Sequence, residues 1–323
     1  MIRGRADNRR MPLRFTLRQL EYFVAVGEAG SIAHASDKVN VSSPSISAAV
    51  SQMEEEFGLQ LFVRKHAHGL SLTPAGHQFM AQAKSVLNEA HALSRLADNI
   101  SGMVQGPLSV GCLLTFAQRV VPGLRRQFEA KYPNVRISQV EQDQARLFDL
   151  LRRAEIDVAL TYDLDIPSDL NFLALAELPP YAILPEGHPL ADRRSVSAED
   201  LKDHPMVLLD LPISAEYFHS FFARIGARPL IAERTRDMAV MHSLVGNGFG
   251  YSIANIRPLS DQAPDGRPLV YVPLTGSARP LHLGLVTSGG ADNVLTVKAF
   301  IDHCRASISA DSIPGLRIGL EEG

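Results

Sequence analysis

The stretch SIAHASDKVNVSSPSISAAVSQM, residues 31–53, predicts two helices joined by a tight turn at Asn40-Val41. Ser31 stands where it can cap the first helix, because a serine hydroxyl accepts hydrogen bonds from the free N–H groups of a helix start. Pro44 suits the first turn of the second helix, where its missing N–H would have no partner in any case. We therefore expect a helix-turn-helix in this part of the chain.

The second of these helices, capped by Ser42 or Ser43, is expected to have two different faces. Apolar residues recur at helical spacing and predict the buried face, which comprises Ile46, Val50 and Met53. Small and polar residues are left for the open face, which comprises Ser45, Ala48, Ala49 and Gln52. The glutamates at 54–56 follow at the far end, where we expect a solvated face or an ion pair with a nearby Arg or Lys.

The flanking sequence predicts a winged domain over residues 15–76. An amphipathic first helix precedes the turn and carries Leu17, Leu20, Phe23 and Val24 at helical spacing. After Gly58, residues 59–72 are expected to form a two-stranded wing with Gly69 near its tip. A helix-turn-helix serves to place one short helix in the major groove of DNA.

A long helix is predicted to begin at Pro74, with no break before Gly102. It carries an apolar stripe from Phe79 to Ile100, and a solitary helix cannot bury such a stripe. We therefore expect the stripe to form a dimer surface. Residues 77–107 are assigned to this dimerisation helix and the hinge that follows it.

From Leu108 the pattern changes to alternating strands and helices, which predicts an α/β fold with parallel strands. Residues 108–308 are expected to form two similar lobes, with the chain returning to the first lobe at 281–286. Residues 309–323 look like a loosely held C-terminal tail. Residues 1–14 are expected to form a basic flexible extension, with Met11 as an alternative start.

Composition limits the class of protein. The 323 residues suffice for two or three domains, and no apolar run reaches the roughly 18 residues of a membrane span. The basic N-terminus lacks the apolar core of an export signal, and two cysteines, Cys112 and Cys304, fit a reducing compartment, so we expect a cytoplasmic protein. The first 100 residues hold 11 Lys and Arg against 9 Asp and Glu, whereas the remainder holds 21 against 26. Only the N-terminal part is therefore expected to attract DNA.

The whole chain resembles LysR-type transcriptional regulators. In the N-terminal part the resemblance is carried by LRQLEYF (17–23), GSIA (30–33) through VSSPSIS (41–47), LFVR (61–64) and LSLTPAG (70–76). In the C-terminal half it is carried by YPNV (132–135), EIDVAL (155–160), GHPL (187–190) and LVGNGFG (244–250). The resemblance implies a homodimeric or homotetrameric regulator of double-stranded promoter DNA, with linker helices paired antiparallel. Its C-terminal domain would resemble a periplasmic binding protein and hold a small-molecule effector between two lobes.

The recognition helix departs from the family pattern. Many members carry a polar residue at the place of Ser43 and Arg-Gln at the places of Ala48 and Ala49, and an alanine can offer a base only its methyl group, for example to a thymine methyl. We therefore expect the basic wing and the shape of the DNA to contribute more to DNA recognition than in those members. The residues expected to contact DNA are Ser31, Ser42, Ser43, Pro44, Ser45, Ser47, Ala48, Ser51, Gln52, Arg64, Lys65 and His66.

Residues that follow strand ends are the effector candidates, because ligands of open α/β sheets bind there. Thr115 stands where a helix begins and would suit an anion, whereas Asp210 would repel a carboxylate. The charge of the effector therefore stays open, with an organic acid as one candidate. The residues expected to contact the effector are Leu113, Thr115, Gln144, Tyr162, Asp210, Leu211, Ser214 and Asn255. For each single residue a purely structural role is nearly as well supported.

Other functions have weaker support. The glycine-rich stretch 246–250 follows a helix and precedes a strand, the reverse of a dinucleotide-binding loop. His66, His68 and His77 have no Cys or carboxylate at metal-ligand spacing, and no nucleophile elbow is found, so we expect no catalytic residue, metal or cofactor. A solute-binding protein would need an export signal, and an enzyme with a DNA-binding appendage would need a nucleophile and base in the cleft. An architectural DNA-binding protein without effector would differ only in ligand binding.

Overall fold

The computed structural model describes residues 14–65, 69–276, 279–309 and 312–317. The expected N-terminal extension and His66 therefore lie outside the described residues, apart from Arg14. The chain forms two compact units, Met1–Ser94 and Arg95–Gly323, each with its own hydrophobic core. In the part of the chain that the structure describes, no helix is long and apolar enough to cross a membrane.

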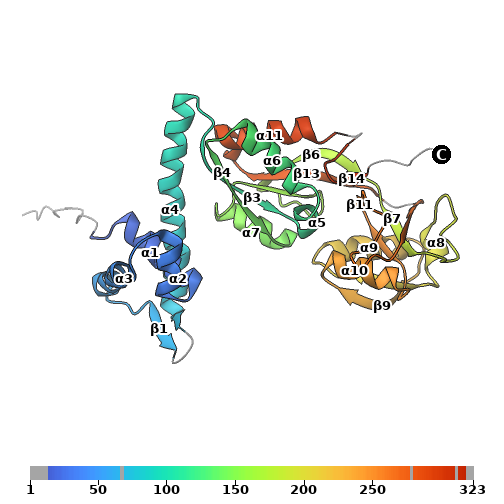
Figure 1. Cartoon of the computed structure of the whole chain (residues 1–323), viewed down its shortest axis with the longest axis horizontal. Coiled ribbons are helices and arrows are strands. Elements are labelled where there is room, and N and C mark those ends of the chain that lie inside the picture. Colours follow the sequence, from blue (N-terminus) through green and yellow to red (C-terminus); the bar gives the residue numbers. More distant parts are fainter. Residues whose placement is uncertain (1–13, 66–68, 277–278, 310–311, 318–323) are drawn as a thin grey trace, which may run out of the picture. The chain divides into compact units, whose positions relative to one another are not determined.

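The first unit is a three-helix domain with a wing and the start of a long helix (Figure 1). Its elements are α1 (Leu17–Ala29), α2 (Ile32–Val39), α3 (Ser43–Phe57), β1 (Phe62–Lys65), β2 (Gly69–Leu72) and α4 (Pro74–Ser101). Ser31 caps α2 by accepting from the backbone N–H of His34, as the sequence predicts. The wing strands pair antiparallel, with Phe62 opposite Leu72. The predicted winged helix-turn-helix is confirmed.

The α4 helix packs against the winged domain over its first half. Ala83 and Leu87 are buried in the core of that domain. The first half of the apolar stripe is therefore covered within the chain, whereas the sequence analysis expects the whole stripe to face a partner. Further along, Leu93 and Leu96 are 71% and 54% exposed. At the start of α4, a Cβ on Gly76 would lie 2.1 Å from the carbonyl oxygen of Leu61, so only glycine allows this close approach of helix and wing.

The first lobe of the second unit is a five-stranded sheet of order β4-β3-β5-β13-β6. Its elements are β3 (Gly106–Cys112), α5 (Leu114–Ala117), α6 (Val121–Lys131), β4 (Val135–Glu141), α7 (Gln144–Arg152), β5 (Val158–Tyr162), β6 (Leu170–Leu178), β13 (Leu281–Ser288), the short 3-10 helix η1 (Ala291–Asn293) and α11 (Leu295–Ser307). Strands β3, β4 and β5 run parallel, whereas β13 is antiparallel to both β5 and β6. The α6 and α11 helices lie on one side of this sheet and α7 on the other (Figure 1). As expected, the chain returns to the first lobe through β13.

The second lobe repeats the α/β pattern on a smaller scale. Its elements are β7 (Tyr181–Pro185), α8 (Ala198–Leu201), β8 (Pro205–Leu209), α9 (Ser214–Ala223), β9 (Leu230–Thr235), α10 (Met238–Gly246), β10 (Ser252–Ala254), β11 (Arg257–Pro258) and β12 (Leu269–Pro273). The sheets β10-β7-β12 and β8-β9 are linked by a bridge between Met206 and Tyr251. The predicted two-lobed α/β fold is confirmed.

Residues 312–317 pack against the two-lobed unit, although the sequence analysis expects a loose tail from residue 309 onward. Its strand β14 (Leu316–Arg317) pairs antiparallel with β11, and Ile313 and Leu316 are buried. A Cβ on Gly315 would lie 2.1 Å from the carbonyl oxygen of Arg119 in the first lobe. The segment thus touches both lobes. The sequence does not predict this pairing, because a strand of two residues is too short to show a periodicity.

Candidate functional site

The exposed face of α3 offers small polar groups. Ser42, Pro44, Ser45, Ala48, Ser51 and Gln52 are exposed, and Ser31, Ser43 and Ser47 are half-buried. Ala49 is only 8% exposed, so its placement on the open face is wrong. The reason is geometric, because Ile46, Ala49, Val50 and Met53 follow the i, i+3, i+4, i+7 spacing of one helix face. The two alanines therefore have different roles, and only Ala48 remains available to a base.

Two hydrogen bonds order the polar groups of this face. Ser42 is the N-cap residue of α3, but its hydroxyl lies 2.8 Å from the hydroxyl of Ser45 and makes no capping bond. Gln52 accepts a hydrogen bond from the side-chain amide of Gln19 at 3.1 Å. Gln19 also completes a capping box with Thr16 at the start of α1. The Gln52 side chain is therefore oriented by a second helix before any DNA arrives.

Glu54 connects α3 to the wing. Its Oε1 accepts hydrogen bonds from the backbone N–H groups of Leu61 and Phe62 at 2.7 and 3.1 Å. The sequence analysis expected a solvated glutamate or an ion pair, and for Glu54 this is wrong, since its partners are the amides that open the wing. The sequence does not predict these contacts, because they depend on how the chain reverses after Gly58 and brings the start of the wing back to Glu54. Among the described residues Glu56 does meet a cation, Arg14, at 3.8 Å.

For the basic residues of the wing, the structure describes the position of the backbone only. Arg64 and Lys65 lie in β1, opposite Leu70 and Gly69. Leu70 also donates its N–H to the carbonyl oxygen of Gly30, at 2.8 Å, so the wing is tied to the end of α1. The assignment of Arg64 and Lys65 to DNA contacts stays a prediction.

In the second unit, four of the predicted effector residues carry a polar group and are buried. Thr115, Gln144, Tyr162 and Asn255 are all less than 8% exposed. Tyr162 stacks on Phe116 with ring centroids 4.9 Å apart. Burial raises the pKa of Tyr162, and the nearby Thr115 hydroxyl offsets part of that rise. The α5 helix that holds Thr115 has only four residues, so the expected anion site at its start has little dipole behind it.

The side-chain amides of Gln144 and Asn255 are fixed by backbone carbonyl groups. The Gln144 Nε2 donates to the carbonyl oxygens of Tyr162 and Leu164, and the Asn255 Nδ2 donates to that of Leu178 and to the hydroxyl of Tyr217. A carbonyl can only accept, so the amide nitrogens must point toward it. The opposite atoms, Gln144 Oε1 and Asn255 Oδ1, are buried and have no hydrogen-bond partner among the described residues.

Of the remaining predicted residues, Leu113 lies in the first lobe, between β3 and α5, and the other three lie in the second lobe. Leu113 is buried, whereas Asp210, Leu211 and Ser214 are half-buried. Asp210 pairs with Arg234 at 3.2 Å, which removes part of its expected repulsion of a carboxylate. Ile213 has φ 71° and ψ −51°, and the N–H of Ser214 donates to the carbonyl oxygen of Pro212 at 2.8 Å. This is a γ-turn of the rare, strained kind, set at the start of α9.

A chain of hydrogen bonds between the lobes was missed by the sequence analysis. Tyr217 of α9 donates to the carbonyl oxygen of Arg279 at 2.6 Å, and the Arg279 guanidinium donates to Asp163 at 2.7 Å. Burial works to raise the pKa of Asp163, but hydrogen bonds from His282 and Arg279 outweigh it and the net shift is downward. Asp163 belongs to the first lobe and Tyr217 to the second. No sequence pattern connects them, because they come together only where the chain passes from the first lobe to the second and back again.

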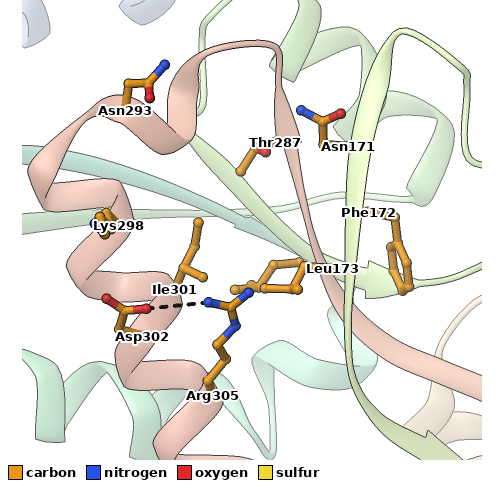
Figure 2. A pocket seen from close by; sticks show the side chains of 10 residues that line it. Asn171, Phe172, Leu173, Thr287, Asn293, Lys298, Ile301, Asp302 and Arg305 are labelled. Carbon is orange, nitrogen blue, oxygen red and sulfur yellow. Dashed lines mark ion pairs between the residues drawn. The ribbon is translucent and has the colours of Figure 1, made fainter.

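A separate hollow lies in the first lobe between β6 and α11 (Figure 2). Its volume is about 460 Å³, and its lining includes Phe172, Leu173, Ile301 and Arg305. Arg305 pairs with Asp302 at 3.6 Å, and both side chains are more than half exposed. None of the residues predicted to bind effector lines this hollow.

Comparison with known proteins identifies both units. Residues 17–77 match the model described as bacterial regulatory helix-turn-helix protein, lysR family, and residues 101–309 match the LysR substrate binding domain. The transcriptional activator protein LysR of Escherichia coli is 28% identical over 298 residues, which cover 90% of this chain and 93% of that protein.

Solved structures agree with this result. HinK, a LysR family transcriptional regulator from Pseudomonas aeruginosa, is 36% identical with a TM-score of 0.61, and the match covers 91% of this chain and 99% of HinK. Full-length CbnR in complex with its target DNA is 23% identical with a TM-score of 0.66, over 90% of this chain and 99% of CbnR, and supports the fold. The winged domain, the two-lobed unit and these matches together show that the chain belongs to the LysR family of DNA-binding, effector-binding transcriptional regulators.

Proposed function

We propose that the chain is a cytoplasmic regulator, not an enzyme, that binds promoter DNA as a homodimer or homotetramer. The face of α3 that carries Ser45, Ala48 and Gln52 would enter the major groove, with the wing on the phosphates. The exposed Leu93 and Leu96 of α4 support an oligomer contact on that helix. A small molecule between the two lobes would control DNA binding.

One observation carries the effector part of this proposal. Gln144 Oε1 and Asn255 Oδ1 are buried without a hydrogen-bond partner among the described residues. A buried polar atom without a partner costs about 1–3 kcal/mol, so native proteins seldom leave several of them unused. A ligand that bonds to these atoms would recover that cost.

The free atoms also narrow the chemical class of the effector. Both are amide oxygens, which accept hydrogen bonds and cannot donate them. The effector is therefore expected to present hydroxyl, amine or amide hydrogens. A plain organic acid offers these atoms no donor, so an acid would need such groups beside its carboxylate.

Differential scanning fluorimetry of the full-length protein with a metabolite panel tests the proposal. Hydroxylated or amino compounds should raise the unfolding temperature, with a stabilisation of about 2.7 kcal/mol at a ligand concentration 100 times Kd. Asn255→Leu should abolish the shift, whereas Asn247→Leu, at an exposed site in the same lobe, should keep it. An equal response of the two variants would contradict the assignment.

A further inference from the structure

Three arginine side chains gather around Tyr271 at the junction of the two lobes. Arg119 follows α5 in the first lobe, Arg257 lies in β11, and Arg317 lies in the C-terminal β14. All three act electrostatically on the Tyr271 hydroxyl, whose pKa is raised chiefly by burial. The guanidinium of Arg257 lies 5.8 Å from the centre of the Tyr271 ring. Strands β11 and β14 lie beside each other between the lobes (Figure 1).

A single carboxylate balances these three cations. Asp261 is the only acidic group among the described residues that acts on Tyr271. It is engaged by Arg317 at 2.9 Å, whereas Arg257 reaches it only at 4.0 Å. Within the described part of the chain, Arg119 has no carboxylate within ion-pair distance. The cluster therefore carries two positive charges more than its described partners neutralise.

Part of this charge is shielded from water, although Arg119 and Arg257 are half-buried as whole residues. The Nε atoms of both Arg119 and Arg257 are buried and have no hydrogen-bond acceptor among the described residues. Burial also lowers the pKa of Arg119, which means that the surroundings destabilise its charged form. A buried guanidinium N–H without an acceptor is costly, and a bound anion would offset that cost.

Neutral groups complete the surroundings of the cluster. The Tyr271 hydroxyl lies 3.3 Å from Nε2 of His242 on α10. Burial, helped by the charge of Arg119, lowers the pKa of His242 to about 4, so at neutral pH it adds no charge of its own. Tyrosine hydroxyl and imidazole N–H can both donate to an oxyanion.

We propose that a small multivalent oxyanion, of the phosphate or dicarboxylate kind, binds between Arg119 of the first lobe and Arg257 of the second. The guanidinium group presents two parallel N–H donors that match such oxygens. The site is distinct from the effector cleft, because Tyr217 there is influenced by Arg279 and Asp163 and by none of the three clustered arginines. It does not depend on the effector proposed above.

The position of the site gives the anion a role in the lobe arrangement. Its two principal donors come from different lobes, so the anion would bind best when both reach it. By linkage, binding then favours the arrangement of lobes in which Arg119 and Arg257 face each other. The anion would act as a counter-charge that joins the lobes at their junction.

Isothermal titration calorimetry of the full-length protein with sodium phosphate and, separately, sodium succinate tests the proposal, with ionic strength held constant by sodium chloride. Saturable binding of either probe is expected, and the preferred probe identifies the source of the oxyanion. Arg119→Met should weaken binding at least about tenfold, which is the loss of one charge-assisted hydrogen bond. Arg119→Lys keeps the charge and should give an intermediate loss.

Two controls separate this site from others. Arg305→Met removes an exposed arginine of the first lobe and should bind the probe as the wild type does. Asn255→Leu, which disables the proposed effector cleft, should also leave the affinity unchanged, so failure of one site is distinguishable from failure of the other. Absence of saturable binding by both probes, or wild-type affinity in Arg119→Met and Arg119→Lys, would overturn the proposal.

Discussion

Replacing Glu54 with alanine should loosen the wing without changing the surface that faces DNA. The Glu54 carboxylate accepts from the backbone N–H groups of Leu61 and Phe62, and Leu61 is fully buried. Each bond to a charged acceptor contributes about 1.5–3 kcal/mol when shielded, and about 1 kcal/mol is reasonable for this half-buried site. Losing both should destabilise the wing by about 2 kcal/mol, which is roughly a 30-fold change in its opening equilibrium.

Hydrogen–deuterium exchange of the full-length protein, followed by mass spectrometry, measures this opening directly. Peptides that cover residues 59–64 should exchange roughly 30-fold faster in Glu54→Ala, and DNA affinity should fall because the wing is no longer fixed. Glu54→Gln keeps an acceptor without its charge and should lose about half as much free energy. Glu55→Ala is the matched control, since Glu55 is exposed. If Glu54→Ala exchanged no faster than Glu55→Ala, the anchoring role of Glu54 would be refuted.

Three further predictions concern other parts of the chain. Gly76→Ala should lower the free energy of unfolding by about 1–3 kcal/mol in urea titrations followed by circular dichroism, because its Cβ would meet the Leu61 carbonyl oxygen at 2.1 Å; an unchanged midpoint would show that helix and wing can separate freely. Arg64→Ala should weaken binding to all duplexes about equally and lower the salt slope by about one unit, and a sequence-dependent loss would instead assign Arg64 to base contacts. Folding lowers the pKa of Asp163, so the ionised Asp163 carboxylate stabilises the folded protein. This contribution to the free energy of unfolding is fully present above the pKa of a free aspartate, about 4, and is lost as the pH falls through the lower pKa of the folded state. Asp163→Asn should therefore be less stable at pH 7 and lose less stability on acidification, and parallel pH profiles of the two proteins would contradict this.

Local signals account for what the sequence predicted well. The cap at Ser31, the Pro44 start of α3 and the glycine at the wing tip depend on neighbouring residues in the chain. The apolar spacing of Ile46, Val50 and Met53 likewise predicted the buried face of α3. Ala49 was misplaced because an alanine is compatible with either face, and its burial is decided by packing.

Contacts between distant segments account for what was missed. Glu54 finds its partners across the turn at Gly58, and Asp163 meets Arg279 116 residues further along the chain. The C-terminal β14 is held by Arg317 and Asp261, which no periodicity connects. For the effector candidates, the sequence could indicate strand ends but not which atoms stay free, since that depends on which backbone carbonyls occupy the amides of Gln144 and Asn255.

Fluorescence anisotropy of the full-length protein with the DNA upstream of its own gene tests the central claim most directly. A scrambled duplex of the same length serves as the control, and the titration is repeated at several salt concentrations. A sequence-specific regulator should prefer the upstream duplex by about 10³-fold or more at physiological salt. Equal and steeply salt-dependent binding to both duplexes, unchanged by any compound that stabilises the two-lobed unit, would contradict the account.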